Sequence, residues 1–223
     1  MTAAAPAEPG TVWDARAEAY RTSPTHAGGA DLDRVIELCE PRTGLVAIDV
    51  ATGGGHVARR LREAGCLVTT VDPTPGMQPD VIARAECLPF ADGSFELAVN
   101  RYAAHHYDDV AEAIREMGRV AADRVVVEDL LYQDEACEQA ELLRDPTHKR
   151  NYTEAERRAL FEGAGLDVVA VEIQKVDHPL EPWIARTGCE GDDADRVREL
   201  LSPYTVDGVW TNEVIILKGK KRA

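Results

Sequence analysis

The stretch AIDVATGGGH, residues 47–56, runs a short apolar segment into a carboxylate and then into three consecutive glycines. Such a run is typical of the first strand, turn and helix of a doubly wound α/β sheet, in which ligands bind beyond the carboxyl ends of the strands. Gly53, Gly54 and Gly55 let the backbone of the turn approach a ligand closely. The sequence therefore predicts a ligand site at this turn.

Short apolar runs and helical patterns alternate along the rest of the chain. Buried strands are expected at 45–50, 67–71, 95–99, 124–128 and 166–173, and helices at 57–64, 109–121, 153–163 and near 194–201. The last apolar run, 211–218, has no room before it for a crossover helix, so we expect it to be antiparallel or to form a hairpin-like edge. The alternation predicts an α/β fold.

The charge balance restricts the class of partner. The chain has 25 Lys and Arg against 40 Asp and Glu, a formal net charge of −15, which repels phosphate backbones and anionic lipid. We therefore expect a small-molecule substrate, with no nucleic acid and no membrane. No apolar run approaches the roughly 18 residues of a membrane span, and the first ten residues have no signal-peptide pattern. A cytoplasmic location with reduced cysteines, and no metal site, is the expectation.

Two carboxylates bear on the identity of the ligand. Asp72 ends the second expected strand, where an acid accepts hydrogen bonds from ribose hydroxyls of either NAD or S-adenosylmethionine. Asp49 ends the first strand and would repel the pyrophosphate of a dinucleotide. It favours instead the sulfonium and ammonium groups of S-adenosylmethionine. The alternative is that Asp49 only hydrogen-bonds N–H groups of the turn itself.

A family resemblance follows from three segments, IDVATGGGH, VTTVDPTPGM and AECLPFADGSFELAVNRYAAHHYDDVAEAIREMGRV. Together they resemble class I S-adenosylmethionine-dependent methyltransferases, and within them the small-molecule branch that includes the ubiquinone and menaquinone C-methylating enzymes. The resemblance implies a Rossmann-like, three-layer α/β/α fold with a seven-stranded, mostly parallel sheet and an antiparallel last strand. It implies a leader and cap segment at 1–30 and a single methyltransferase domain at 31–223.

The same resemblance implies roles for individual residues. Those expected to bind S-adenosylmethionine, with S-adenosylhomocysteine as the product, are Asp49, Ala51, Gly53, Gly55, Asp72, Ala85, Asn100 and Arg101. Three departures from the family pattern affect this pocket. Ala51 replaces the first glycine, Arg84 replaces an acid and is expected to stack on the adenine or pair with Asp80, and residues 73–81 replace most of a helix. One side of the adenine pocket should therefore be thinner.

The loop after the fourth expected strand carries the candidate catalytic residues. His105 and His106 follow that strand, and an imidazole takes a proton readily near neutral pH. We expect His106 to be the base, with Tyr20 or His26 from the cap as its partner. A packed, structural histidine is the alternative for each. The acceptor-binding candidates are His26, Tyr102 and Tyr107, and Arg101 would suit a carboxylate or phenolate.

Two other function classes stay open on sequence grounds. An NAD-dependent reductase is disfavoured by Asp49 and by the absence of a Tyr-x-x-x-Lys pair. A methyltransferase fold repurposed as a cyclase, decarboxylase or binding protein is compatible with Arg84 and the short connection. The main expectation is methyl transfer by in-line displacement to a small molecule. A homodimer is compatible with the sequence.

Overall fold

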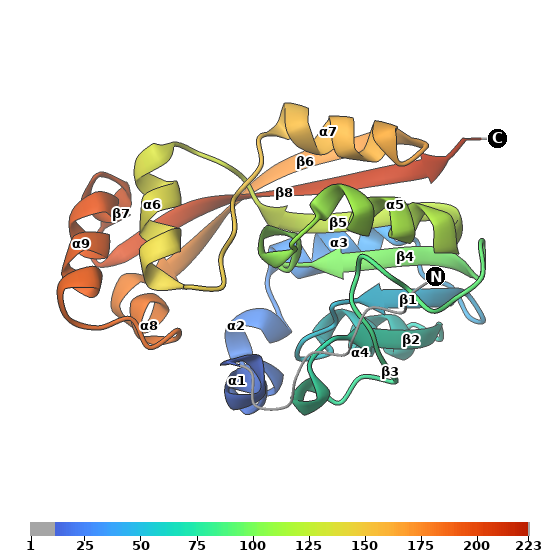
Figure 1. The fold of residues 1–223 in the computed structure, drawn as a ribbon, viewed down its shortest axis with the longest axis horizontal. Coiled ribbons are helices and arrows are strands. Elements are labelled where there is room, and N and C mark those ends of the chain that lie inside the picture. The colour runs from blue at the N-terminus through green and yellow to red at the C-terminus, as the bar shows by residue number, and fades with distance from the viewer. Residues whose placement is uncertain (1–11, 223) are drawn as a thin grey trace.

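The structure is a computed structural model and describes residues 12–222. Its centre is a mixed sheet in the order β3-β2-β1-β4-β5-β8-β6, with the short β7 paired to β8 (Figure 1). The strands are β1 (Val46–Val50), β2 (Leu67–Asp72), β3 (Val81–Ile82), β4 (Phe95–Arg101), β5 (Ala121–Leu130), β6 (Leu166–Pro179), β7 (Thr205–Val206) and β8 (Val209–Lys221). The expected Rossmann-like sheet is thus confirmed.

The last strand is antiparallel, as predicted, but it does not form the edge of the sheet. β8 lies between β5 and β6 and is antiparallel to both, with Val127 opposite Leu217 on one side and Val171 opposite Leu217 on the other. β8 residues 214–218 are buried, which suits a central strand. The edge is β6, whose residues alternate between more and less exposed positions.

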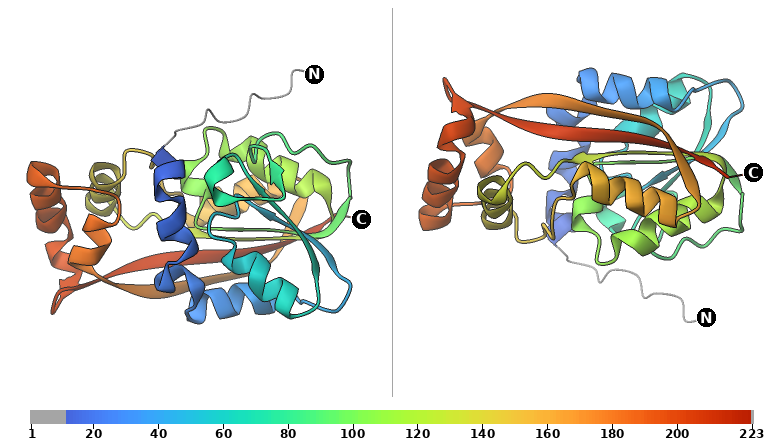
Figure 2. Two further views of the ribbon diagram at one scale, coloured as in Figure 1. Left: turned by 90° about the horizontal axis from the view of Figure 1, so that it is seen from below. Right: turned by 90° about the horizontal axis from the view of Figure 1, so that it is seen from above.

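Helices cover both faces of the sheet. They are α1 (Val12–Arg21), α2 (Pro24–Ala27), α3 (Ala30–Leu38), α4 (His56–Glu63), α5 (Val110–Val120), α6 (Glu135–Arg144), α7 (Glu154–Gly163), α8 (Leu180–Ala185) and α9 (Gly191–Leu201), with single 3₁₀ turns η1 (Pro75–Met77), η2 (Ala104–His106) and η3 (Ser202–Tyr204). Apolar residues of α5 and α7 pack on one face, and those of α3 and α4 on the other. Figure 2 shows these three layers edge-on.

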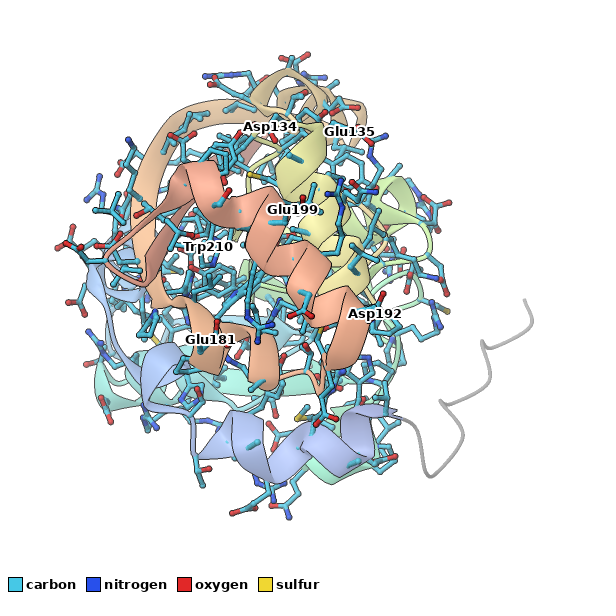
Figure 3. The ribbon with its side chains drawn as sticks, turned by 90° about the vertical axis from the view of Figure 1, so that its left-hand side faces the viewer. Asp134, Glu135, Glu181, Asp192, Glu199 and Trp210 are labelled. Carbon is cyan, nitrogen blue, oxygen red and sulfur yellow. The ribbon has the colours of Figure 1, made fainter. Side chains whose placement is uncertain are left out.

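A separate small core lies beyond the end of the sheet. There β6 and β8 continue as a two-stranded ribbon, since β6 residues 175–179 pair with β8 residues 209–213, while β5 pairs only with residues 214–220 of β8. The ribbon carries α8, α9 and β7, which pack with α6 around Trp183 and Trp210. Figure 3 looks onto this end and shows Trp210 behind α9, with Glu181, Asp192 and Glu199 near the surface.

The two N-terminal helices lie between this small core and the parallel half of the sheet (Figure 2). The expected leader, residues 1–10, lies outside the described residues. The expected cap residues 12–27 form α1 and α2, and α1 packs on η1, beyond the carboxyl end of β2. The chain therefore places its N-terminal helices over the edge of the sheet at which the glycine turn lies.

Candidate functional site

A cavity of about 340 Å³ opens at the carboxyl ends of β1, β2 and β4. Ligand pockets in proteins range from roughly 300 to 1,000 Å³, so its size suits a small organic molecule. Residues from the glycine turn, the loops after β2 and β4, and α1 line it together. They are Trp13, Tyr20, His26, Ala51, Thr52, Gly53, His56, Val57, Asp72, Pro73, Thr74, Met77, Arg84, Ala85, Glu86, Arg101, Tyr102, Ala103, His106, Tyr107 and Asp108.

The glycine turn presents its backbone to the cavity. Gly53 has φ of +50°, and a Cβ added to it would meet no heavy atom within 4 Å. The space beside it is therefore open for a ligand. Ala51 also has a left-handed backbone, with φ of +54°, a conformation that costs a non-glycine residue about 1–2 kcal/mol. Gly55 begins α4 and does not line the cavity.

Asp72 holds this turn from the neighbouring strand. Its Oδ2 accepts a hydrogen bond from Gly53 N over 3.0 Å, and its Oδ1 accepts one from Thr74 N over 2.9 Å. Burial raises the pKa of the carboxyl group. The side chain lines the cavity as well, so one carboxylate both fixes the turn and faces a ligand.

Asp49 lies beneath the turn and not at the mouth of the cavity. Only 2% of the residue is exposed, and its Oδ2 accepts hydrogen bonds from Thr52 Oγ1 over 2.6 Å and Ala58 N over 3.1 Å. Asp49 therefore ties the side chain of Thr52 in the turn to the start of α4, an arrangement that differs from both sequence hypotheses, because no backbone N–H of the turn itself donates to Asp49 in residues 12–222. Burial raises the pKa of Asp49 to about 6. Direct contact between Asp49 and a ligand is not part of this geometry.

Asn100 likewise lies behind the cavity wall. Its Nδ2 donates to Val50 O over 2.7 Å and to Tyr107 Oη over 2.9 Å, while its buried Oδ1 has no hydrogen-bond partner among the described residues. Tyr107 does line the cavity, and burial raises the pKa of its hydroxyl group well above the usual value. Asn100 therefore acts on the cavity through Tyr107 and the end of β1.

Arg84, Ala85 and Glu86, which follow β3, also line the cavity. Arg84 does not pair with Asp80, as one sequence hypothesis had it. Its guanidinium donates to Glu86 over 3.2 Å and to Asp108 over 2.5 Å. Asp80 instead accepts hydrogen bonds from Thr70 and Arg62 on the outer side of β2. Ala85 is buried and lines the cavity.

The shortened connection after Asp72 forms η1, and α1 covers it. Asp14 Oδ1 accepts a hydrogen bond from Gly76 N over 2.8 Å, and Arg21 donates to Gly76 O. Met77 of η1 is buried and lines the cavity. The wall that we expected to be thinner is therefore completed from within the same chain, by α1.

Arg101 lines the cavity, but its guanidinium is already bound. It pairs with Asp31 and, over 2.5 Å, with Glu128, and it donates to His26 O over 3.1 Å. Both carboxylates are buried, and burial raises the pKa of Glu128 to about 8. Tyr102 also donates to Asp31, over 3.1 Å. The suggestion that Arg101 receives an acceptor carboxylate is not supported by this geometry.

The two adjacent histidines have different environments. His105 is 7% exposed, lies outside the cavity lining, and donates from Nδ1 to Asp129, over 2.5 Å. His106 lines the cavity, and its Nδ1 donates to Thr147 O over 3.0 Å. A ring nitrogen that donates to a carbonyl carries the proton, which leaves Nε2 of neutral His106 with a free lone pair. Burial, together with nearby His105, lowers the pKa of His106 to about 3.

Aromatic and imidazole side chains from the cap lie beside His106. The ring of Trp13 meets that of His106 edge-on, with centroids 4.9 Å apart, and Tyr20 lies next to Trp13. His26 shares a hydrogen bond with Ser23 Oγ over 2.7 Å, and burial lowers its pKa to about 3. Tyr20, His26 and Tyr102 all line the cavity. These side chains of the cap therefore form a continuous group that reaches from His106 to His56, which directly follows the glycine turn.

Comparison with known proteins assigns the fold and the turn to one family. A family model described as a methyltransferase domain matches residues 48–126. The uncharacterized methyltransferase YcgJ of Bacillus subtilis is 31% identical over 217 residues, which cover 86% of this chain and 83% of that protein. The chain is a class I S-adenosylmethionine-dependent methyltransferase.

Two solved structures share the fold of this methyltransferase, and a further relative matches part of its sequence. The crystal structure of YcgJ superposes with a TM-score of 0.77 at 26% identity, covering 86% of this chain and 98% of that one. The BH2331 protein of Bacillus halodurans C-125 gives 0.76 at 22% identity, with coverage of 87% and 100%. The demethylmenaquinone methyltransferase of Corynebacterium kroppenstedtii is 29% identical over 127 residues, only 52% of this chain and 56% of that enzyme.

The residues around the cavity of the methyltransferase suit its cofactor. Gly53 leaves room for a ligand against the backbone, Asp72 offers a carboxylate beside it, and the cap adds aromatic surface. No group of His, Cys, Asp and Glu side chains within residues 12–222 is arranged to hold a metal ion. In the same described part of the chain, every helix is too short or too polar to cross a membrane.

Several lining residues of the methyltransferase were not predicted from the sequence. Trp13, His56, Met77 and Glu86 line the cavity. His56 directly follows the glycine turn, a position that could have suggested it, and it donates from Nε2 to Tyr20 O over 2.9 Å. No local sequence pattern indicates that Trp13 lines the cavity, because its position depends on how α1 packs over the edge of the sheet.

Proposed function

We propose that this methyltransferase methylates a small molecule bound between the cap and the loop after β4, with His106 as the group that takes the acceptor's proton. The observation that carries the proposal is the state of the His106 ring. Its Nδ1 is committed to Thr147 O, so Nε2 is a hydrogen-bond acceptor at the end of the cavity lined by Trp13 and Tyr20.

The cofactor occupies the other end of the cavity in this proposal. Ala51, Gly53 and Asp72 line the part next to the turn, and Ala85 closes the far end. Asp49, Gly55 and Asn100 lie outside the lining and hold these groups in place. S-adenosylmethionine supplies an electrophilic methyl group when bound. Asp72 would accept hydrogen bonds from the ribose hydroxyls, and its contact with Gly53 would keep the turn in its open form.

His106 would act as a weak but sufficient base. An acceptor hydroxyl becomes strongly acidic as its oxygen bonds to the methyl carbon, so a neutral imidazole takes its proton even with a low pKa. Before that step, Nε2 would accept a hydrogen bond from the acceptor O–H or N–H and orient the lone pair of the heteroatom. Most of the rate comes from such positioning. Tyr20, His26, Tyr102 and Tyr107 would enclose the acceptor, and His105 would support His106 from behind.

Charge and enclosure support a small-molecule acceptor. A net charge of −15 disfavours nucleic acids and anionic membranes, and the cavity has room for a small molecule. Residues 12–30 would serve as the cap and the remainder as one methyltransferase domain. The likeness to a demethylmenaquinone methyltransferase over about half of the chain supports including quinols among the acceptors to be tried.

An acceptor screen tests this proposal. Purified protein is incubated with S-adenosylmethionine and a panel of phenols, catechols, quinols, amines and carboxylic acids, and S-adenosylhomocysteine is measured together with the methylated product. We expect the two to form in equal amounts and His106→Gln to lower the rate of both by ~10²-fold or more. Equal rates in His106→Gln and in the unaltered protein would reject His106 as the base. S-adenosylhomocysteine without a methylated product would reject the transfer itself.

A further inference from the structure

Guanidinium groups gather where the cap meets the small core, and three of them are paired. Arg16 of α1 pairs with Asp145 over 3.1 Å. Arg101 pairs with Asp31 and Glu128. These carboxylates therefore already have cationic partners.

The third paired group is Arg144 of α6. It pairs with Glu141 over 3.0 Å and lies over the ring of Trp183, with 3.9 Å between the guanidinium carbon and the ring centroid. Its Nε also donates to Trp183 O over 2.9 Å. Arg144 is buried and fully engaged.

Arg186, directly after α8, is the fourth. Within residues 12–222 its half-buried guanidinium has no hydrogen bond and no ion pair. An arginine shielded from water without an anion forgoes the bidentate contact for which its planar group is suited. Arg186 is therefore a cation to which the described part of the chain supplies no hydrogen-bonded or ion-paired anion.

Thr187, the residue after Arg186, is fixed to two other helices. Thr187 O accepts a hydrogen bond from Arg16 over 3.0 Å, and Thr187 Oγ1 donates to Arg144 O over 2.7 Å. These contacts hold the end of α8 against both α1 and α6. Tyr20, which lines the cavity, is four residues after Arg16 and so lies on the same face of α1.

The electrostatics agree with this placement. Burial is the main cause that lowers the pKa of His26, and the positive charge of Arg186 is the second. Tyr20 and Tyr102 in turn act to raise the pKa of Arg186. These three partners line the acceptor end of the cavity. Arg186 itself is not part of the lining, so a bound molecule would reach it only by extending past these side chains toward the end of α8, which Arg16 of α1 holds through Thr187 O.

We propose that Arg186 recognises an anionic group of the acceptor, a carboxylate or a phosphate, that extends past Tyr20 and Tyr102 toward the end of α8. The inference rests on the proposed function, because it places the acceptor in the same cavity. It assigns to Arg186 the selection of anionic over neutral acceptors. Arg101, which the sequence suggested for that role, is saturated by protein groups.

Titrations with small probes test the proposal without a known acceptor. Protein saturated with S-adenosylhomocysteine is titrated with benzoate, benzamide and phenyl phosphate, and tryptophan fluorescence or calorimetry reports binding. The proteins are the unaltered chain, Arg186→Gln, Arg186→Lys and the control Arg198→Gln. Arg198 lies on α9 and pairs at the surface with Glu181 and Asp195, so its loss removes a charge from the same small core but not from the cavity.

The expected result is that at least one anion binds 10-fold or more tightly than benzamide. Arg186→Gln should remove that preference while leaving benzamide affinity within 2-fold, Arg186→Lys should restore part of it, and Arg198→Gln should keep it. Preference for benzoate would identify a carboxylate acceptor, and preference for phenyl phosphate would identify a phosphorylated one. The proposal is overturned if neither anion binds more tightly than benzamide, or if no probe binds at all. It is also overturned if Arg186→Gln keeps the same preference for the anion as the unaltered chain.

The two proposals fail in distinguishable ways. If S-adenosylhomocysteine itself does not bind, the cofactor assignment in the proposed function is wrong. If it binds equally to the unaltered protein and to Arg186→Gln, but the anion preference is absent, only the role of Arg186 is wrong. If Arg186→Gln no longer binds S-adenosylhomocysteine, Arg186 is needed for folding or for cofactor binding. That result also contradicts the proposal.

Discussion

The carboxylate of Asp72 accepts a hydrogen bond from the backbone N–H of Gly53, over 3.0 Å. This contact joins the ends of β1 and β2 at the wall of the cavity. It keeps Gly53 in a left-handed conformation with open space where a side chain would be. One residue thus fixes the shape of the cofactor end and supplies a carboxylate to it.

Loss of Asp72 should therefore weaken cofactor binding. We expect Asp72→Ala to reduce the affinity for S-adenosylhomocysteine by ~1–3 kcal/mol, the cost of lost hydrogen bonds to a charged group, as measured by calorimetry. Asp80→Ala is the control, because Asp80 caps β2 from outside the cavity. Equal affinity in the unaltered protein and in Asp72→Ala would remove Asp72 from the site.

The base is tested by His106→Gln. Turnover with an acceptor found in the screen should fall by ~10²-fold or more, the usual contribution of a positioned base. Affinity for S-adenosylhomocysteine should stay within 2-fold, because the proposal assigns the cofactor to Ala51, Gly53, Asp72 and Ala85 and not to His106. A fall in affinity with unchanged turnover would be the opposite of what the geometry implies.

Substitution of Gly76 tests whether the packing of α1 on η1 holds the cap in place. A Cβ there would lie 2.7 Å from Asp14 Oδ1 and 3.2 Å from Asp14 Cα, so Gly76→Ala should push α1 away from η1. Faster proteolysis within residues 12–27 and weaker cofactor binding are the expected results. Gly163→Ala is the control, since a Cβ at Gly163 meets nothing within 4 Å. Identical proteolysis of the two variants would show that the cap does not depend on this contact.

Acid sensitivity of the fold should depend on His26. Burial, followed by the charge of Arg186, lowers the pKa of His26 to about 3 in the folded chain, from 6.5. The folded state therefore binds its proton less readily than the unfolded state. The stability that this group contributes is complete above pH 6.5 and is lost as the pH falls from 6.5 toward 3.

Urea unfolding at pH 7 and pH 5 measures this effect. In His26→Gln the loss of unfolding free energy between the two values should be smaller than in the unaltered chain, by on the order of 1–2 kcal/mol. An equal loss in both proteins would mean that His26 is as easily protonated in the folded state as in the unfolded one.

The parallel half of the fold could be predicted from local pattern. The strand before the glycines, the acid at the end of the second strand and the helix with a capping box at Thr153 and Glu156 each depend on a few neighbouring residues. The helix α6, in contrast, was missed. Five of its ten residues are buried, but three of these are charged, so the sequence has no apolar stripe there; Cys137 and Ala140 pack in the small core with α9, far along the chain.

Site residues were predictable where neighbouring residues in the sequence position them. They were less predictable where contacts with distant segments of the chain do so. Asp72 and Gly53 lie at strand ends and line the cavity as expected. Asp49 and Asn100 were expected to face the ligand, but hydrogen bonds to Ala58 and Val50 keep them one layer behind. The environment of Arg101 and Arg186 depends on α1, α2 and α8, whose docking no local pattern encodes.

Calorimetry with S-adenosylmethionine, S-adenosylhomocysteine and NAD⁺ in parallel tests the central claim most directly. We predict that the first two bind and that NAD⁺ does not. In Asp72→Ala the affinity for both S-adenosylmethionine and S-adenosylhomocysteine should be lower. Binding of NAD⁺ alone, or binding of none of the three, would contradict the account of this cavity as a methyl-donor site.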